Sequence, residues 1–470
     1  MTMFRSLLFA AIFLNVPALC AQNTLTLEEV FDRVRRNHPV ARQAGLLTGL
    51  ASAELLKARG GFDPKLFGDY SGKVFQDKTY FSIGEYGVKL PSRLGLEFKA
   101  GYNTASGNYL NPESTLPSDG QAVLGLRWTL GRGLLLDDRR ADLLVAKAGL
   151  RLAEYEKRLV FNDLFFSAAR AYWAWVVADA QAGIYEQALN RAQERLTGIR
   201  ESWVQGDKPA IDTLEAFLLV QSRELDLTDA RLAARNARIE LNFFLWNNPG
   251  EAGSQDTAWT PPVVFTFTQT APLPDPGQLE RELPAGHPAL LATQVKLEQL
   301  SVERRLIAEN RKPQLDLDYN FLGSGWQFFP ESTGSAADLL GNNVKFGVQF
   351  SYPLLNRKVR GDLQKTDLKI EQTRQNLVQK SAEQVNKLRL YVSELNTLAA
   401  QARLYGDMTE NYRRLLEAEQ EKFRIGESSV FLLNSREQKL LDTQAKWAKV
   451  LGEYQKAAAG VQWAMGSLGQ

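Results

Sequence analysis

The chain repeats its own plan, and this duplication constrains its fold more than any other feature. Its two histidines, His38 and His287, are each followed by proline and lie 249 positions apart. At that offset identical residues continue in order through Ser52/Ser301, Glu54/Glu303, Pro64/Pro313, Leu66/Leu315, Asp69/Asp318 and Tyr70/Tyr319. At an offset of 220 the identical pairs are Arg140/Arg360, Asp142/Asp362, Leu143/Leu363, Glu201/Glu421 and Gly206/Gly426. Each copy is therefore treated as one structural repeat.

Each half shows the same order of patterns: a short helix, strands, a very long helix, a turn and a second long helix. We expect the first repeat at residues 22–248, with strands at about 65–130 and long helices at about 134–199 and 210–248. The second is expected at 277–470, with strands at about 314–352 and long helices at about 355–424 and 428–467. Residues 249–276 contain six of the 18 prolines and predict an irregular joint.

The first 21 residues have the pattern of a secretory signal peptide, which takes no part in the fold. Arg5 precedes an apolar run, Leu7–Val16, and small residues follow near Ala21. Cleavage there removes Cys20, the one cysteine of the chain, and leaves no thiol for a disulfide. A second interpretation makes Cys20 a lipidated first residue, although Leu19 stands where lipidation signals carry a small residue.

The sequence after the signal peptide contains no stretch that resembles a transmembrane helix. Its most apolar internal stretch, Ala168–Ala178, is far shorter than the ~18–20 residues needed to cross a bilayer. An exported chain of this kind is either soluble outside the inner membrane or inserted as a β-barrel, the other structure that satisfies its backbone in lipid. Lys+Arg of 56 against Asp+Glu of 54 leaves no general basic field that would favour nucleic acid.

Two segments of the second half alternate between apolar and polar residues, as strands with one apolar face and one solvent-exposed face do. The apolar members are Leu315, Leu317, Tyr319 and Phe321 in the first segment and Val344, Phe346, Val348, Phe350 and Tyr352 in the second. Their length and alternation match outer-membrane strands, and half-solvated strands of a soluble sandwich are the alternative. Aromatic residues at the strand ends and in the loop after Gly323 favour the membrane, where rings lie at the interface.

The first half contains the equivalent strands, around Leu66–Val74 and Leu124–Leu130, and an extra amphipathic hairpin at 80–103. This hairpin either adds strands to a barrel or lengthens its neighbours. Four to six strands cannot close a channel alone, because the smallest membrane barrels have about eight. Open strand edges are not tolerated in lipid, so we expect several copies of the chain to build one β-barrel together.

The predicted helices are far longer than the ~11–12 residues of a typical globular helix. Residues 362–405 contain neither glycine nor proline, and apolar residues recur there at three- and four-residue steps, as in Leu388, Val392 and Leu395. The predicted class is a mixed α+β membrane protein, internally duplicated. It combines long antiparallel helical hairpins, which form an α-barrel tunnel, with strands contributed to a shared oligomeric transmembrane β-barrel.

Three phrases carry a resemblance to a known family: Leu25–Thr26–Leu27–Glu28–Glu29 followed by Asn37–His38–Pro39, then Tyr352–Pro353–Leu354–Leu355–Asn356–Arg357, then Phe423–Arg424–Ile425–Gly426–Glu427–Ser428–Ser429. In this duplicated order the chain resembles the TolC-like outer-membrane efflux proteins over essentially its whole mature length. The resemblance implies a homotrimer, a barrel with four strands per protomer and a helical tunnel across the periplasm. It also implies a location in the outer membrane of a Gram-negative-type envelope, and two partners: a periplasmic adaptor (membrane fusion) protein and an inner-membrane pump.

The resemblance implies that the two helix-turn tips dock onto the adaptor. Gly206 and Gly426 occupy the turn-glycine positions of the family. Lys208 and Pro209 follow the first glycine, and Glu427, Ser428 and Ser429 follow the second. Taken alone, the glycines are helix C-caps that supply a positive φ, so docking is a role added to a local one.

The resemblance also places a periplasmic gate beside the tips. Asp212 matches an acidic gate position and lies one helical turn from Glu215. At the equivalent second-repeat positions, where well-known members carry an aspartate ring, this chain has Leu432 and Ser435. The gate's tyrosine and arginine positions hold Phe423 and Ser428. The gate is therefore altered, and Asp212 alternatively serves as a helix-start acid that the macrodipole favours.

The sequence contains no pattern that indicates catalysis. Its two histidines precede prolines at equivalent places, which indicates a structural role, and P-loop, GxSxG, HExxH and cysteine-cluster motifs are missing. Tyr172, Trp173 and Trp175 are expected to pack between helices rather than to bind a ligand. We expect no enzyme, no metal and no cofactor.

The sequence therefore predicts the outer-membrane channel component of a tripartite efflux or type I secretion system. Such a channel is a passive trimeric exit duct that opens when adaptor and pump dock. The alternative is a non-conducting periplasmic coiled-coil scaffold or adhesin, which would show the same helices but does not account for the two-faced strands.

Overall fold

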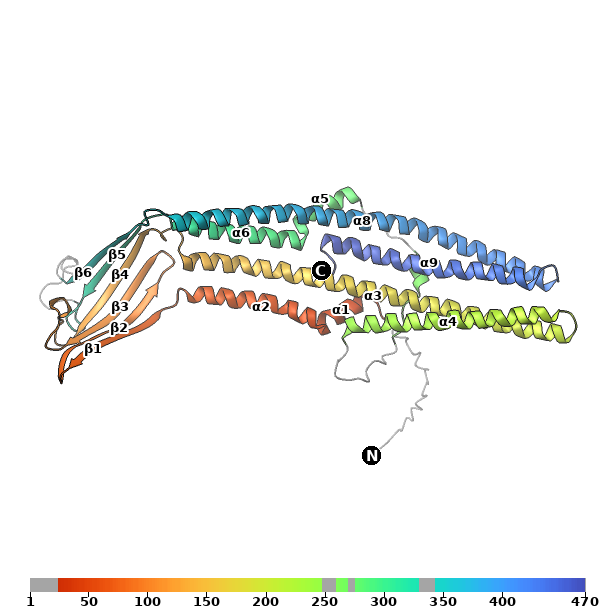
Figure 1. The fold of residues 1–470 in the computed structure, drawn as a ribbon, viewed down its shortest axis with the longest axis horizontal. Coiled ribbons are helices and arrows are strands. Elements are labelled where there is room, and N and C mark those ends of the chain that lie inside the picture. The colour runs from red at the N-terminus through yellow and green to blue at the C-terminus, as the bar shows by residue number, and fades with distance from the viewer. Residues whose placement is uncertain (1–23, 247–258, 269–274, 329–342, 470) are drawn as a thin grey trace, which may run out of the picture. The chain divides into compact units, whose positions relative to one another are not determined.

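The computed structural model describes residues 24–246, 259–268, 275–328 and 343–469. The predicted signal peptide and most of the proline-rich joint lie outside the described residues. The elements of the first repeat are α1 Leu27–Asn37, α2 Pro39–Gly60, β1 Lys65–Phe75, β2 Lys78–Pro91, β3 Leu96–Ser106, η1 Pro112–Ser114, β4 Gln121–Gly131, α3 Asp138–Val204 and α4 Ala210–Leu245 (Figure 1). Those that follow are η3 Val264–Thr268, α5 Pro276–Gly286, α6 Pro288–Glu309, β5 Gln314–Leu322, β6 Val344–Ser351, α8 Arg357–Arg424 and α9 Val430–Met465.

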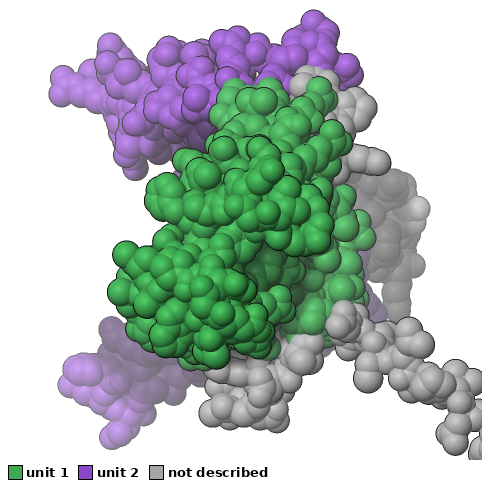
Figure 2. Space-filling model, turned by 90° about the vertical axis from the view of Figure 1, so that its right-hand side faces the viewer, with its two compact units in different colours: residues 1–38, 168–271, 397–456 green, residues 39–167, 272–396, 457–470 purple. Residues whose placement is uncertain are grey.

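The predicted class, long helices combined with an antiparallel sheet, is confirmed. The chain divides into two compact units, coloured separately in Figure 2. Unit 1 comprises residues 1–38, 168–271 and 397–456, and unit 2 comprises residues 39–167, 272–396 and 457–470. Unit 1 contains both helix-turn tips, and unit 2 contains the whole sheet.

The sheet of unit 2 has six antiparallel strands in the order β1-β2-β3-β4-β5-β6 (Figure 1). Pairing of β4 with β5 joins the two repeats, with Leu124 opposite Phe321 and Leu126 opposite Tyr319. The extra hairpin at 80–103 forms β2 and β3 inside this sheet. The sheet of one chain therefore has six strands, whereas the family resemblance implies four barrel strands per protomer. β2 and β3 each pair with both neighbours, with one register shift between Lys73 and Val74 of β1.

The register separates an apolar face of the sheet from a polar one. One row of directly opposed residues crosses all six strands and is apolar: Leu66, Val88, Ala100, Leu124, Phe321 and Val344. The adjacent row points to the other face and is Lys65, Lys89, Lys99, Gly125, Asn320 and Lys345. Because side chains alternate along a strand, the alternation seen in the sequence becomes a two-faced sheet.

The described helices do not include one that is both long enough and apolar enough to cross a membrane.

The first family phrase builds the start of unit 1. Thr26 caps α1 and accepts a hydrogen bond from the Glu29 N–H, while Glu29 accepts from the Thr26 N–H, which is a capping box. Leu25 is fully buried, and its carbonyl accepts a hydrogen bond from the Tyr172 hydroxyl at 2.9 Å. Tyr172, Trp173 and Trp175 are all buried in α3. These aromatic residues therefore belong to the core of the unit, because the buried Tyr172 hydroxyl has a hydrogen-bond partner and the rings pack against each other.

His287 ends α5 and starts α6 in unit 2. Its Nδ1 accepts a hydrogen bond from the Ala289 N–H at 3.2 Å, so the ring caps the following helix. Burial, and secondarily the charge of Lys387, lowers the pKa of His287 to about 4. The ring is therefore neutral at pH 7 and can accept this bond. His38 is also buried, with the rings of Phe243, Phe244 and Trp246 around it.

Candidate docking tips and gate

The first tip connects α3 to α4 and is shaped by Gly206. This residue has φ +87°, a conformation that a side chain disfavours and glycine does not. The Gly206 N–H donates to the Trp203 carbonyl at 3.0 Å and the Asp207 N–H donates to the Ser202 carbonyl at 2.9 Å, the paired bonds of a Schellman motif. Pro209 is the N-cap of α4. The chain therefore reverses within five residues between the two helices.

The second tip, between α8 and α9, repeats this geometry. Gly426 has φ +84°, and its N–H donates to the Phe423 carbonyl at 3.2 Å. The Glu427 N–H donates to the Lys422 carbonyl at 2.8 Å, which completes the same motif. Ser429 starts α9, since its Oγ accepts a hydrogen bond from the Leu432 N–H at 3.2 Å. Ser428 donates to the buried carboxylate of Glu419 and so ties the turn to α8.

An apolar core fixes the two tips to each other within unit 1. It contains Ala192, Leu196 and Ile199 of α3, Ala216 and Val220 of α4, and Val430 of α9. Phe423 packs against this core and also against a second one, formed by Leu416 of α8 with Leu433 and Leu440 of α9. The Lys208 ammonium lies 4.8 Å from the centre of the Phe423 ring. Phe423, a predicted gate residue, therefore joins the hairpins of both repeats.

A buried polar cluster lies behind the tips, and sequence reasoning missed it. Glu437 of α9 is 1% exposed. Its two oxygens form ion pairs with α3, at 3.0 Å to Arg191 Nε and 2.7 Å to Arg195 Nη1. The Arg195 Nη1 also donates to Asn434 Oδ1 at 2.7 Å, and Asn434 Nδ2 donates to Glu215 Oε1 at 3.3 Å. Together they link α3, α4 and α9 and are called the polar cluster below.

The predicted gate residues occupy different environments. Glu215 is half-buried in the polar cluster, whereas Asp212 is half-buried in the first turn of α4. Leu432 and Ser435, at the equivalent places of α9, are exposed. The two carboxylates are therefore on one helix, but among the described residues it is Glu215 that has a side-chain partner on another helix, Asn434 of α9.

Exposed apolar side chains flank both tips, and they too were missed from sequence. Ile211 after the first tip is 71% exposed and Phe431 after the second is 68% exposed. They are 220 positions apart, the same offset that relates Gly206 to Gly426. Trp203, Leu214, Ile425 and Leu432 are exposed nearby. Exposed apolar side chains that form a contiguous patch mark a protein–protein contact surface, so the two tips are candidates for one.

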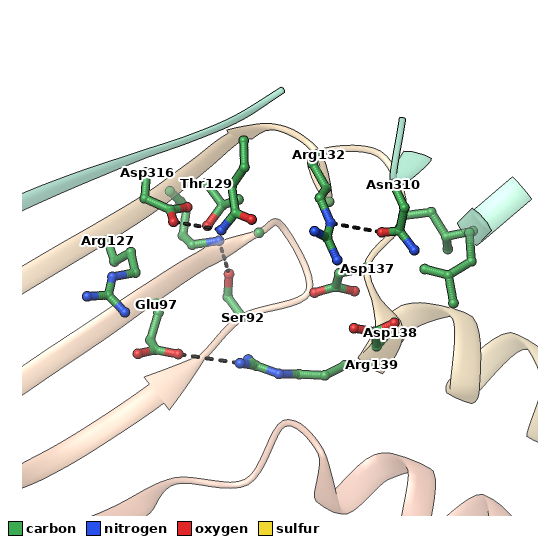
Figure 3. Close-up of a pocket in the computed structure, with 16 residues that line it drawn as sticks. Ser92, Glu97, Arg127, Thr129, Arg132, Asp137, Asp138, Arg139, Asn310 and Asp316 are labelled. Atoms are coloured by element: carbon green, nitrogen blue, oxygen red, sulfur yellow. Dashed lines mark hydrogen bonds and ion pairs between the residues drawn. The ribbon is translucent and has the colours of Figure 1, made fainter. Parts of the chain in front are cut away.

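A second set of polar contacts lies in unit 2, where the strands meet the helices (Figure 3). Arg139 in the first turn of α3 extends toward Glu97 of β3, with 3.5 Å between Nη2 and Oε2. Arg132 Nε donates to Asn310 Oδ1, just after α6, at 2.9 Å. These partners are 42 and 178 residues apart in the chain, which explains why the sequence does not reveal them.

We expect removal of the Glu437 carboxylate to be costly. Glu437→Ala leaves the Arg195 side chain, which is 11% exposed, without a counter-charge, and loss of one partner of a buried pair destabilises by about 3–5 kcal/mol. Glu186→Ala is the matched control, because Glu186 forms an exposed ion pair with Arg231 in the same unit, and such pairs contribute about 0–1 kcal/mol. Urea titrations in detergent, followed by circular dichroism, measure both free energies of unfolding. Equal, small losses would contradict a stabilising role for the polar cluster.

Residues 279–467 match the family described as outer membrane efflux protein. A search of curated protein sequences finds no match to the chain. Several solved structures share its fold. The outer membrane channel CmeC of Campylobacter jejuni is 16% identical with a TM-score of 0.63, and the match covers 94% of this chain and 85% of CmeC. The outer-membrane channel OprN is 15% identical with a TM-score of 0.65, covering 94% and 90%.

The open state of the Neisseria gonorrhoeae outer membrane channel MtrE gives a TM-score of 0.65 at 13% identity, with 94% of this chain and 88% of MtrE covered. These three structures are outer-membrane channels. The findings confirm the resemblance to the TolC-like outer-membrane efflux proteins: residues 279–467 match the outer membrane efflux protein family, and the chain shares the fold of these channels along nearly its whole length.

Proposed function

We propose that this chain is the outer-membrane channel component of a tripartite efflux or type I secretion system. Three copies form a passive exit duct, with the sheet in the outer membrane and the helices in the periplasm. A periplasmic adaptor and an inner-membrane pump are its partners, and the pump supplies direction and energy. The observation that carries this proposal is the sheet with one exposed apolar face and one charged face.

The apolar face requires a covering that the chain itself does not supply. Leu66 is 86% exposed, Phe346 73% and Phe350 67%. Transfer of each such side chain from water to an apolar medium is worth about 1.5–3 kcal/mol. The other face carries lysines, Glu85, Glu97, Arg127 and Asp318, and Arg127 Nε lies 2.6 Å from Asp318 Oδ1. Lipid on the first face and water on the second satisfy both sets of groups.

The sheet also supports assembly from several copies. In the described part of the chain, β1 and β6 each pair on one side only. Unpaired backbone groups cost several kcal/mol each in hydrocarbon, so the two edges have to be joined by further copies. A non-conducting scaffold would leave the apolar face in water, and the family match favours the channel over that alternative.

The tips are proposed as the adaptor-docking sites. Gly206, Lys208 and Pro209 shape the first, and Gly426, Glu427, Ser428 and Ser429 shape the second. Ile211 and Phe431 support this role, because they add apolar contact area at equivalent places beside the two turns. Asp212, Glu215 and Phe423 are proposed as the periplasmic gate. Their position at the tips supports this, since adaptor contact there would act directly on α4 and α8.

We expect Ile211→Glu and Phe431→Glu to weaken binding of the cognate adaptor by roughly tenfold or more, because each places a charge in an apolar contact. Both side chains are exposed, so the fold should persist. Phe431→Leu keeps the apolar character and is the matched control. Affinity is measured with the purified adaptor immobilised on a sensor surface, and the amount of assembled protein in the outer membrane is measured in parallel. Adaptor binding by both Glu variants at the wild-type affinity would remove the docking role.

For the gate, the isosteric double variant Asp212→Asn/Glu215→Gln tests whether these carboxylates line the ion path. Loss of two negative charges per copy should reduce the preference for cations and move the reversal potential in a KCl gradient toward zero. Asp229→Asn removes an exposed charge further along α4 and serves as the control. The measurement is single-channel recording in planar bilayers. An unchanged reversal potential and conductance would exclude these residues from the constriction.

A further inference from the structure

We propose that the hairpin β2–β3 is part of the transmembrane wall itself, so that each copy contributes six strands and three copies close an 18-stranded barrel. This inference rests on the trimer proposed above. The inference concerns the number of barrel strands per copy. It departs from the family resemblance, which implies four. The partner at each sheet edge is a second copy of this chain: β1 of one copy pairs with β6 of the next.

Pairing on both sides places the hairpin within the sheet, with a single register shift between Lys73 and Val74 of β1. β2 pairs with β1 along Lys65–Phe75, and β3 pairs with β4 along Leu96–Asn103. The two hairpin strands pair with each other from Ser82 opposite Ser106 to Pro91 opposite Glu97. In the described sheet, β2 and β3 therefore lie between β1 and β4, and β1 forms its backbone hydrogen bonds with β2. If the hairpin left the sheet, it would expose the backbone groups of both strands to lipid, which is costly.

The side chains of the hairpin continue both faces of the sheet. On the apolar face Tyr86, Val88, Leu90 and Phe98 are exposed, in line with Leu124 and Trp128 of β4. On the polar face Lys99 forms an ion pair with Glu85 across the hairpin. A flap folded into the lumen would place the apolar row in water. One lying outside the barrel would place the ion pair in lipid. Membership of the wall satisfies both faces.

Contacts at the helix end hold the hairpin in place. Its turn is closed by the Ser92 N–H, which donates to the Leu96 carbonyl at 2.8 Å. Glu97 then pairs with Arg139 in the first turn of α3, as Figure 3 shows. The Arg93 guanidinium lies 5.9 Å from the centre of the Phe62 ring, just after α2. The turn is thus fixed to the starts and ends of the same helices that hold the other strands.

The consequence is a wider exit. Barrel diameter grows roughly in proportion to strand number, so 18 strands give a barrel about half as wide again as 12. Barrels of 16–18 strands leave an aqueous channel. We expect the outer mouth of this duct to be wider than that of a duct with four strands per copy. The number of helices at the tips is expected to be the same in both ducts.

The test is strand counting by electron cryomicroscopy of the full chain in lipid nanodiscs. We expect 18 strands around one axis. A matched variant deletes the 30 residues Gln76–Ala105 and joins Phe75 to Ser106. β1 then replaces β3 beside β4, and the even number of deleted residues keeps Leu66 on the apolar face. This variant should form a 12-stranded barrel of about two-thirds the diameter.

A wild-type trimer with 12 strands, and with β2–β3 outside the wall, would overturn the inference while leaving the proposed channel intact. A chain that does not assemble into trimers in lipid would contradict both this inference and the proposed channel. If the deletion variant fails to insert, the strand count of the wild-type particle alone decides between 18 and 12.

Discussion

The structure depends on a sheet that requires lipid on one face, water on the other and further strands at its two edges. Its hydrogen bonds are satisfied inside the sheet but not at the outer sides of β1 and β6, and its apolar side chains have no covering in the described chain. Lipid on one face, water on the other and further copies at the edges resolve all of these together. All connections between the sheet and the helices lie at the same end of the strands: α2 leads into β1, β4 into α3, α6 into β5 and β6 into α8.

At the tips the two repeats are held together by two different kinds of contact. An apolar core that includes Leu196, Val220 and Val430 supplies stability, and Phe423 shares this core with the neighbouring one. The polar cluster around Glu437 adds specificity, because its hydrogen bonds and ion pairs form only in one alignment of α3 against α9. A tip built in this way keeps a defined shape, which a docking surface requires.

Local patterns in the sequence predicted much of this fold. Strand alternation has a period of two and long helices a period of 3.6, so both were visible in residues such as Leu315–Phe321 and Leu388–Leu395. The turn glycines were visible through the repeat. The role of the hairpin at 80–103 was not, because a pattern of alternation identifies a strand but not its partner. Pairing of β3 with β4 depends on register across a loop of more than ten residues.

The polar cluster shows a second limit. Arg191 and Glu437 are 246 residues apart, and neither carries a local signal for the other. One clue was present: Glu437 follows Leu433 by four residues and precedes Leu441 by four, so it occupies the apolar stripe of α9. A carboxylate in such a stripe requires a buried partner. Ile211 and Phe431 could also have been found, because the repeat offset relates them beside the two tips.

The most direct test of the two-faced sheet is a set of spin labels along β6 in lipid vesicles. Phe346, Val348 and Phe350 lie on one face and Lys345, Gln349 and Ser351 on the other, and all six are exposed in the single chain. Cysteine at each position, carrying a nitroxide, reports access to oxygen dissolved in lipid and to a nickel chelate dissolved in water. We expect the first three labels to meet oxygen and the second three to meet nickel, in strict alternation. Equal access of nickel to all six would contradict the account.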